Sequence, residues 1–259
     1  MNRETGTKNS VQAVDRALTI VELLKNNPSG IGVTELSHHM DLSKSTVHRL
    51  LTSLLTKGYV IKDNMTEQYK LGLKFVEMSA VVLEGIDLRQ AAADMLRALA
   101  DEFNETVHLA IPDQGEVVYI DKIDSNETIR MISRIGKRAP LHCTGIGKIL
   151  LAHMDTEEVE AIIRVRGLRR FTEYTITSES NLMNALAEIK EKGYSLDEQE
   201  HELGIRCAAV PIFDNSTAIA AGISISGPVD RMTDAKIQQI IPVLQQNAQE
   251  ISRRLGYLK

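Results

Sequence analysis

Residues 44–57 carry two separate stripes of side chains at helical spacing, and this pattern constrains the fold more than any other segment. One stripe is apolar and the other polar, and each recurs at i, i+3, i+4 and i+7: Val47, Leu50, Leu51 and Leu54 against Ser45, His48, Arg49 and Thr52. The apolar stripe predicts packing against neighbouring helices. The polar stripe stays exposed near the start of the helix, as a helix that reads base edges in the DNA major groove requires.

Two shorter helical segments precede this helix. Apolar residues at helical spacing, among them Val14 and Leu18, predict a first helix over residues 11–24. Thr34 is the predicted N-cap of a second short helix, and Ser43 is the predicted N-cap of the third. Short helix, tight turn and polar-faced helix is the order of a helix-turn-helix.

A hairpin is predicted after the third helix. Gly58 ends the helix, and residues 59–62 and 68–71 have the composition of two strands joined by a polar turn at 63–67. Three helices followed by a hairpin predict a winged helix-turn-helix. The residues predicted to contact DNA lie on the third helix and on the wing: Ser43, Lys44, Ser45, Thr46, His48, Arg49, Thr52, Lys62, Gln68 and Lys70. The alternative is a small helical protein-interaction module with its polar face in solvent.

The charge distribution favours the DNA-binding interpretation. The chain of 259 residues has a net charge of −5, yet residues 1–74 hold 10 Lys and Arg against 7 Asp and Glu. This segment is therefore positive and the remainder negative. A basic head on an acidic body indicates that only the head meets phosphates.

Other patterns narrow the class of protein. Residues 1–10 are polar and no apolar run approaches the roughly 20 residues that span a bilayer, so we expect a cytoplasmic protein with no membrane partner. Cys143 and Cys207 give neither a disulfide framework nor zinc-ligand spacing, and we expect no metal and no cofactor.

The rest of the chain predicts an α+β body with an antiparallel sheet and flanking helices. The predicted domains are a DNA-binding domain at 1–72, a linker helix involved in dimerisation at 73–86, and a third domain at 87–259. Predicted strands lie at 106–111, 117–123, 129–133, 208–213 and 218–226, and predicted helices at 88–103, 145–154, 156–166, 179–192 and 234–255. Residues 136–141 are predicted as a loop.

Four segments, in the right order along the chain, resemble the IclR family of bacterial regulators. They are residues 42–51 (LSKSTVHRLL), 134–148 (RIGKRAPLHCTGIGK), 202–214 (ELGIRCAAVPIFD) and 222–227 (GISISG). The resemblance implies a winged helix-turn-helix, a linker helix and a GAF-like effector-binding domain. It also implies DNA binding as a homodimer or a dimer of dimers, mostly as a repressor, under the control of a small carboxylate.

The resemblance also implies an effector pocket. Its expected residues are Cys143, Thr144, Gly145, Ile146, Asp197, Cys207, Ser224 and Ser226. Backbone amides that open a helix near residue 145 can hold a carboxylate, and the two serines point to one face of a strand because they lie two apart. The alternatives are a solvated acidic loop for Asp197 and ordinary strand hydroxyls for the serines.

Within the family, residues 120–125 and 131–136 resemble the repressors of pectin and hexuronate degradation, whose effector is 2-keto-3-deoxygluconate. A carbon-catabolic operon controlled by a sugar acid is the resulting expectation. The alternatives are a family member that responds to an aromatic or short keto acid, a DNA-binding protein without an effector, and a metabolite-binding enzyme with a DNA-binding appendage.

The sequence offers little support for an enzyme. His142 and Cys143 are adjacent, and no third group to orient them is evident. A phosphate-binding loop over residues 142–149 fails because His142 stands where the first glycine is needed and Ile149 where Ser or Thr should follow Lys148. We therefore expect no catalytic residues.

Overall fold

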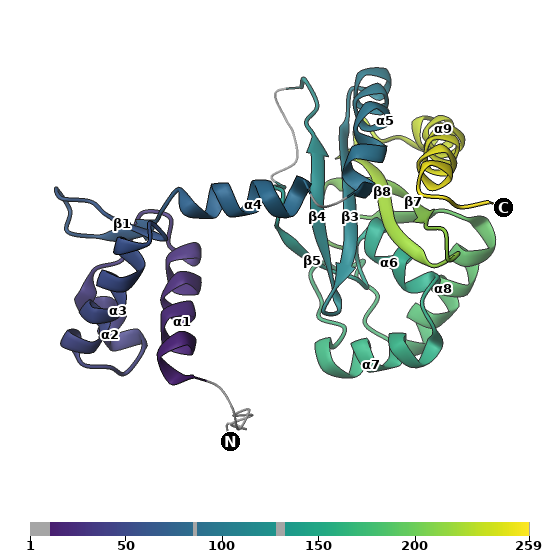
Figure 1. Ribbon diagram of the computed structural model, residues 1–259. Coiled ribbons are helices and arrows are strands. Elements are labelled where there is room, and N and C mark those ends of the chain that lie inside the picture. Colours follow the sequence, from purple (N-terminus) through teal and green to yellow (C-terminus); the bar gives the residue numbers. More distant parts are fainter. Residues whose placement is uncertain (1–10, 85–86, 128–132, 259) are drawn as a thin grey trace. The chain divides into compact units, whose positions relative to one another are not determined.

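The computed structural model describes residues 11–84, 87–127 and 133–258. The chain forms two compact units, one up to residue 85 and one from residue 86. Each unit is described by itself below, with the element labels of Figure 1.

The N-terminal unit contains three helices, a hairpin and a further helix. Its elements are α1 (Gln12–Asn26), α2 (Val33–His39), α3 (Lys44–Thr56), β1 (Val60–Lys62), β2 (Tyr69–Leu71) and α4 (Lys74–Glu84). Strands β1 and β2 pair antiparallel, with Val60 opposite Leu71. This is the winged helix-turn-helix that the sequence predicts.

The core of this unit uses the apolar stripe of α3. Val47 and Leu51 are fully buried together with Ile20, Leu24 and Leu36. Helix α1 turns a different face inward from the one its spacing suggested, because Val14 and Leu18 are more than half exposed.

The predicted caps have mixed outcomes. Ser43 is the N-cap of α3, since its Oγ accepts a hydrogen bond from the Thr46 amide at 3.3 Å. Thr34 as the cap of α2 is wrong, because the helix begins earlier and its N-cap is Gly32, which has no side chain to cap it. The reason is that Ile31 exchanges backbone hydrogen bonds with Tyr69, so the chain leaves this bridge at residue 32 and enters the helix at once.

Helix α4 exposes much of its apolar surface in the single chain. Leu73, just before it, is exposed, as are Val76, Met78 and Val81 on the helix. Such a run of exposed apolar side chains marks a surface suited to a partner.

The C-terminal unit is built on a six-stranded sheet in which every pairing is antiparallel, in the order β5-β4-β3-β8-β7-β6. Its elements are α5 (Asp87–Phe103), β3 (Thr106–Asp113), β4 (Glu116–Ile123), β5 (Arg138–Pro140), α6 (Gly145–Ala152), α7 (Thr156–Arg166), α8 (Glu179–Lys192), β6 (Ser195–Glu198), β7 (Ile205–Phe213), β8 (Ile219–Pro228) and α9 (Asp234–Arg254). The α+β class with a GAF-like second unit is thus confirmed.

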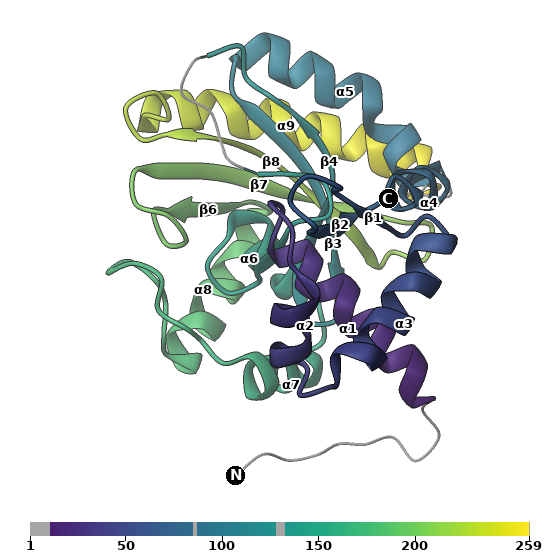
Figure 2. The same ribbon diagram turned by 90° about the vertical axis from the view of Figure 1, so that its left-hand side faces the viewer.

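Helices cover both faces of this sheet. Figure 2 shows α5 and α9 along one face, with α6 and α8 on the other. Alternate strand residues supply the two cores, since Leu109 and Ala208 pack with α5 and α9 whereas Ala110 and Ala209 pack with α6, α7 and α8. Both faces of the strands are therefore buried, which explains their nearly continuous apolar composition.

Helix α6 approaches the sheet so closely that every one of its residues is buried. Three glycines make this possible. A Cβ at Gly145 would lie 2.5 Å from Cys207 Sγ, one at Gly147 2.2 Å from the Leu141 carbonyl oxygen, and one at Gly222 2.9 Å from Ile146 Cγ2.

The sheet differs from the prediction at its edges. β5 forms within the segment predicted as a loop, and β6 was not predicted as a strand because its sequence, SLDE, is polar. Ser195 and Asp197 are buried nonetheless, so the alternation is inverted relative to an ordinary amphipathic strand. Of the strand predicted at 129–133, residues 129–132 lie outside the described residues, and Ser133 is not in a strand.

We expect Gly72→Ala to destabilise the N-terminal unit by about 1–3 kcal/mol, the usual cost of overpacking. A Cβ at this position would lie 2.2 Å from the Gly58 carbonyl oxygen, which is backbone and cannot move aside cheaply. Urea unfolding of the full chain, followed by circular dichroism, measures the change.

Gly32→Ala is the matched control in the same unit, because a Cβ there meets nothing within 4 Å. Its cost is limited to the weaker capping preference of alanine, at most about 1 kcal/mol. Equal unfolding midpoints for the two variants would contradict the packing argument.

Candidate functional site

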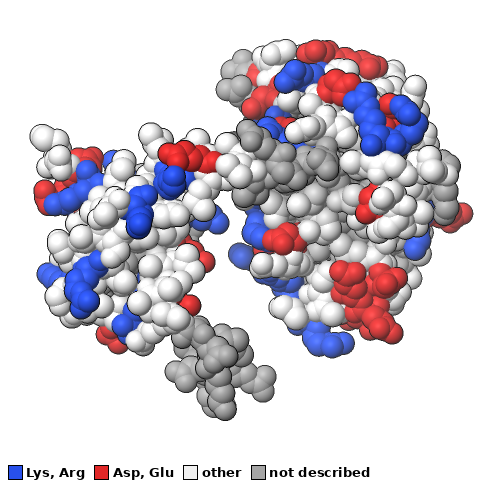
Figure 3. Space-filling model, viewed as in Figure 1, with Lys and Arg blue, Asp and Glu red and all other residues white. Residues whose placement is uncertain are grey.

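The exposed face of α3 contains the predicted DNA-contacting residues. Ser43, Lys44, Ser45, His48, Arg49 and Thr52 are exposed and Thr46 is half-buried. Lys44 and Arg49 form no ion pair within the described part of the chain, so their charges are available to an external anion. In Figure 3, Lys and Arg side chains are spread over the visible face of this unit rather than gathered in one patch.

The two lysines of the wing, unlike Lys44 and Arg49, form ion pairs within the hairpin. Lys62 forms an ion pair with Glu67, and Lys70 Nζ lies 3.3 Å from Asp63 Oδ2. The Asp63 carboxylate also accepts hydrogen bonds from the Met65 and Thr66 amides, and these lower its pKa. The third predicted wing residue, Gln68, is half-buried. The wing therefore presents charges that are already balanced within the hairpin.

A pocket lies in the C-terminal unit between α6 and the sheet. It has about 570 Å³ of empty space, its open mouth included. Seven of the eight residues predicted for an effector site line it: Thr144, Gly145, Ile146, Asp197, Cys207, Ser224 and Ser226. Cys143 is fully buried and is not among the lining residues.

Strand register explains why residues so far apart in sequence meet here. Asp197 of β6 lies opposite Cys207 of β7, and Cys207 lies opposite Ser226 of β8. Residues directly opposite one another on adjacent strands project from the same face. The acid, the thiol and the hydroxyl therefore form one row across three strands.

Sequence reasoning missed several pocket residues. They are His108, Tyr119, Ser133, Lys137, Ala139, His201, Glu202 and Ile205. His108 was missed because the sequence does not show which strands pair. This residue lies opposite Ser224 only because β3 and β8 are adjacent in the sheet. Lys137 contributes a cation to the lining, which suits an anionic ligand.

His108 is held as a neutral imidazole. Burial and the nearby Lys122 ammonium lower its pKa to about 3. Its Nε2 lies 2.6 Å from Ser133 Oγ and its Nδ1 lies 3.5 Å from Ser226 Oγ. A neutral imidazole offers one donor and one acceptor, so this side chain orders the two hydroxyls on either side of it.

Asp197 is the most perturbed acid in the pocket. Burial raises its pKa to about 7. Its Oδ1 accepts a hydrogen bond from the Glu200 amide at 2.7 Å, which counteracts part of that effect. Near neutral pH this carboxyl is thus poised between an acceptor and a hydroxyl donor.

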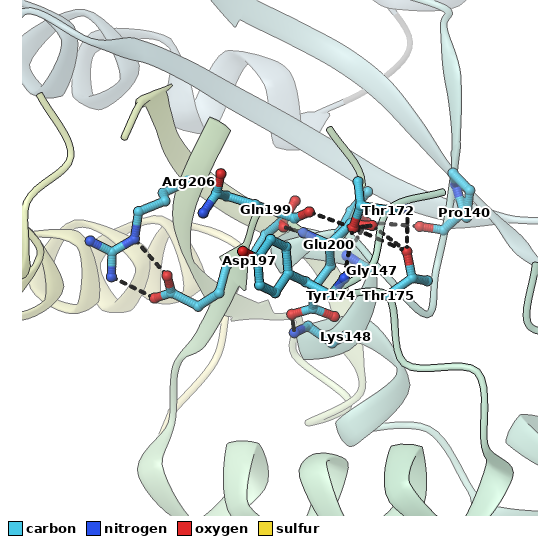
Figure 4. Close-up of polar contacts among 12 residues, drawn as sticks. Pro140, Gly147, Lys148, Thr172, Tyr174, Thr175, Asp197, Gln199, Glu200 and Arg206 are labelled. Carbon is cyan, nitrogen blue, oxygen red and sulfur yellow. Dashed lines mark hydrogen bonds and ion pairs between the residues drawn. The ribbon is translucent and has the colours of Figure 1, made fainter. Parts of the chain in front are cut away.

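A buried ion pair holds the turn that carries the Glu200 amide. Lys148 of α6 pairs with the Glu200 carboxylate, and the side chains of both are at most 7% exposed. Thr172 Oγ1 donates to the Gln199 carbonyl at 2.7 Å and Thr175 Oγ1 to the Glu200 carbonyl at 2.6 Å (Figure 4). Helix α6, the turn after β6 and the segment before α8 are fastened together at this point.

The start of α6 keeps one backbone donor available. The Gly147 amide donates to Thr144 Oγ1 at 3.0 Å, and the Gly145 amide donates to the Cys207 thiol. The Ile146 amide, between them, has no acceptor among the described residues. An amide at a helix N-terminus that lines a pocket is suited to a carboxylate.

Neither cysteine is an activated nucleophile. Burial raises the pKa of Cys207 to about 12 and also raises that of Cys143. His142 Nε2 donates to the Arg169 carbonyl at 2.9 Å, and among the described residues neither cysteine is hydrogen-bonded to this imidazole. A reactive thiol needs a lowered pKa, so the site has the character of a binding pocket.

Metal binding and membrane insertion have no support among the described residues. Within them, no group of three or more His, Cys, Asp or Glu side chains has an arrangement that could hold a metal ion. None of the helices in the same part of the chain is long and apolar enough to cross a membrane.

Two family models match the chain. The model described as IclR helix-turn-helix domain matches residues 13–64, and the one described as bacterial transcriptional regulator IclR C-terminal matches residues 80–253. Together they span both units.

Several characterised proteins are similar over nearly the whole chain. The transcriptional regulator KdgR of Escherichia coli (strain K12) is 42% identical over 96% of this chain and 94% of its own length. The regulator XynR of the same organism is 39% identical over 95% of this chain and 98% of its own length. These relatives are transcriptional regulators, which are not enzymes.

Comparison with solved structures agrees with these sequence matches. The crystal structure of Thermotoga maritima IclR has a TM-score of 0.79 and 35% identity, covering 94% of this chain and 98% of that one. The C-terminal domain of E. coli KdgR has a TM-score of 0.61 and 41% identity, covering 66% of this chain and all of that domain.

We expect Asp197→Asn to change how stability depends on pH. The raised pKa means that the folded protein keeps a proton at Asp197 that the unfolded chain loses near its ordinary pKa of 3.8. The stability of the native chain therefore falls as the pH rises toward 7, by up to about 1 kcal/mol per pH unit. The amide of the variant has no proton to lose. The free energy of unfolding of Asp197→Asn therefore rises relative to that of the native protein between pH 5 and 8.

Urea unfolding at pH 5, 6, 7 and 8 measures this gain. Asp214→Asn is the control, because hydrogen bonds from Ser216 lower the pKa of Asp214 and leave it ionised throughout that range. A difference between Asp197→Asn and native protein that stayed constant from pH 5 to 8 would rule out a buried acid with a raised pKa.

Proposed function

Because this chain belongs to the IclR family of bacterial transcriptional regulators, we propose that α3 reads an operator and that the pocket of the C-terminal unit binds a sugar acid such as 2-keto-3-deoxygluconate. The protein acts in the cytoplasm as a repressor of a carbon-catabolic operon, and binding of the effector changes the affinity of the protein for DNA.

The pocket's polar groups carry the effector proposal. Its lining includes the Ile146 amide and the Lys137 ammonium, which suit a carboxylate. The row of Asp197, Cys207 and Ser226 supplies acceptors and donors at strand spacing, which suits successive hydroxyls. A linear acid with several hydroxyl groups uses both sets of groups. The similarity to KdgR points to the same class.

The DNA-binding proposal assigns roles to the residues of α3 and the wing. Ser45, His48, Arg49 and Thr52 are presented to base edges, and Ser43, Lys44 and Thr46 lie at the helix start, where phosphates are held. Lys62, Gln68 and Lys70 are assigned to phosphates beside the wing, where the two lysines exchange their pairing with Glu67 and Asp63 for pairing with phosphate. The exposed apolar side chains of α4 support a homodimer, alone or as a dimer of dimers.

A different acid is the second candidate effector. Tyr119, Ile146 and Ile205 give the pocket apolar wall area that an aromatic or short keto acid would contact. A solved homologue from Microbacterium hydrocarbonoxydans is a complex with 4-hydroxybenzoate, although at 22% identity it is comparable only in fold.

We expect Arg49→Ala to weaken specific DNA binding by about five- to 150-fold, because a bidentate arginine contact with a guanine is worth about 1–3 kcal/mol. The measurement is fluorescence anisotropy on a fragment selected from genomic DNA by the native protein. Lys25→Ala on exposed α1 is the control for loss of one charge. Native affinity in Arg49→Ala would remove this residue from the reading face.

We expect Ser226→Ala to raise the Kd for 2-keto-3-deoxygluconate about five- to tenfold, the worth of one hydrogen bond. DNA affinity without ligand should stay unchanged. Calorimetric titration of the full chain measures the first quantity and anisotropy the second.

Ser180→Ala on the exposed side of α8 is the matched control. If the native protein binds DNA but no sugar acid, the regulator assignment stands and the second candidate effector is favoured. If Ser226→Ala binds the ligand as tightly as Ser180→Ala, the proposed pocket is not the site.

A further inference from the structure

A second cleft in the C-terminal unit shares no lining residue with the pocket described above. It lies between α7 and the β5–α6 connection and has about 610 Å³ of empty space, its open mouth included. Its apolar lining comes from Leu141, Leu151, Ile162, Ile163 and Leu168. The first two are almost completely buried.

The rim of this cleft is cationic. Its charged residues are Arg166, Arg169 and Glu116. Glu116 is already compensated, because Arg138 lies 3.3 Å and Arg166 3.4 Å from its carboxylate. Arg166 also donates through Nε to the Gln114 carbonyl at 3.2 Å.

Arg169 is left as the uncompensated charge. Within the described ranges, no carboxylate forms an ion pair with it, and its guanidinium carbon lies 5.3 Å from the centre of the Phe171 ring. The aromatic contact fixes the guanidinium beside the apolar lining without neutralising it. An anion at this rim would find a guanidinium that the aromatic contact favours beside the apolar lining.

We propose that this cleft binds a monocarboxylate with a straight alkyl chain, the chain on the apolar lining and the carboxylate on Arg169. A sugar acid fits poorly, since the lining offers hydroxyl groups few partners. His142, the polar side chain at the inner wall, has its Nε2 engaged by the Arg169 carbonyl. The uncompensated Arg169 and the apolar lining therefore define an amphipathic anion.

Phe171 places this cleft beside the first pocket. Its ring centre lies 6.1 Å from that of His142, which lines the cleft, and 5.2 Å from that of His201, which lines the pocket. The next residue, Thr172, is buried and bonded to the turn at Gln199. The two sites are therefore neighbours with separate linings.

The test is calorimetric titration of the full-length protein with butanoate, hexanoate, octanoate and 1-octanol. Burial of each added methylene should raise the affinity about three- to fourfold along the carboxylate series. Arg169→Gln should lower octanoate affinity on the order of tenfold, the worth of a charge-assisted contact, and leave 1-octanol unaffected. Saturating 2-keto-3-deoxygluconate should leave octanoate binding in place.

Arg170→Gln is the matched control. It removes a neighbouring guanidinium that donates to the Glu173 carbonyl and to Thr177 Oγ1 and does not line the cleft. Ile162→Glu, which puts a carboxylate at the apolar lining of the half-exposed α7, should abolish octanoate binding.

Three results would overturn the proposal. They are affinity that does not rise with chain length, equal octanoate affinity in Arg169→Gln and Arg170→Gln, and displacement of octanoate by the sugar acid. The first two leave the sugar-acid proposal untouched, and the third would itself show that the sugar acid binds, so the two proposals fail independently.

Discussion

The close approach of α6 to the sheet is the constraint on which the C-terminal unit depends. A helix of eight residues with every side chain buried has no solvated face, so each polar group on it needs a partner inside the protein. Glycines at 145, 147 and 222 remove the atoms that would hold the helix away from the strands and from Leu141. The pocket exists because the first turn of this helix lies against the strand row of Asp197, Cys207 and Ser226.

The same burial accounts for the electrostatics around the pocket. Lys148 is the one charged residue of α6, and an unpaired ammonium there would cost several kcal/mol. Its pairing with Glu200 brings the turn after β6 onto the helix, and that turn supplies the amide that contacts Asp197. One Glu200 oxygen has no hydrogen-bond partner among the described residues. The pair thus serves to position the turn at some cost in desolvation.

The sequence predicted the helices of this protein better than its sheet edges. The two stripes of α3 were sufficient to predict this helix, because the residues of one helix face recur every three or four positions along the chain. The capping hydroxyl of Ser43 lies next to the helix that it caps. β6 was missed because its buried residues are polar, and hydrophobic periodicity has no signal for a strand that buries hydroxyl and carboxyl groups. His108 could not be assigned to the pocket from local pattern, since its neighbours Ser224 and Ser226 are more than 100 residues away and meet it only through strand pairing. The family resemblance assigned Asp197 and Cys207 to the effector pocket, whereas residue spacing alone did not assign them a role.

The two edges of the C-terminal sheet are its two shortest strands, β5 with three residues and β6 with four, whereas the inner strands have eight to ten. An edge strand exposes unpaired backbone groups that can template the addition of a strand from another molecule. In the part of the sheet that the structure describes, these stubs give such an incoming strand little length to pair with. The sheet is therefore poorly suited to growing from one molecule into the next. Short edge strands of this kind oppose edge-to-edge aggregation in a protein with long, apolar inner strands.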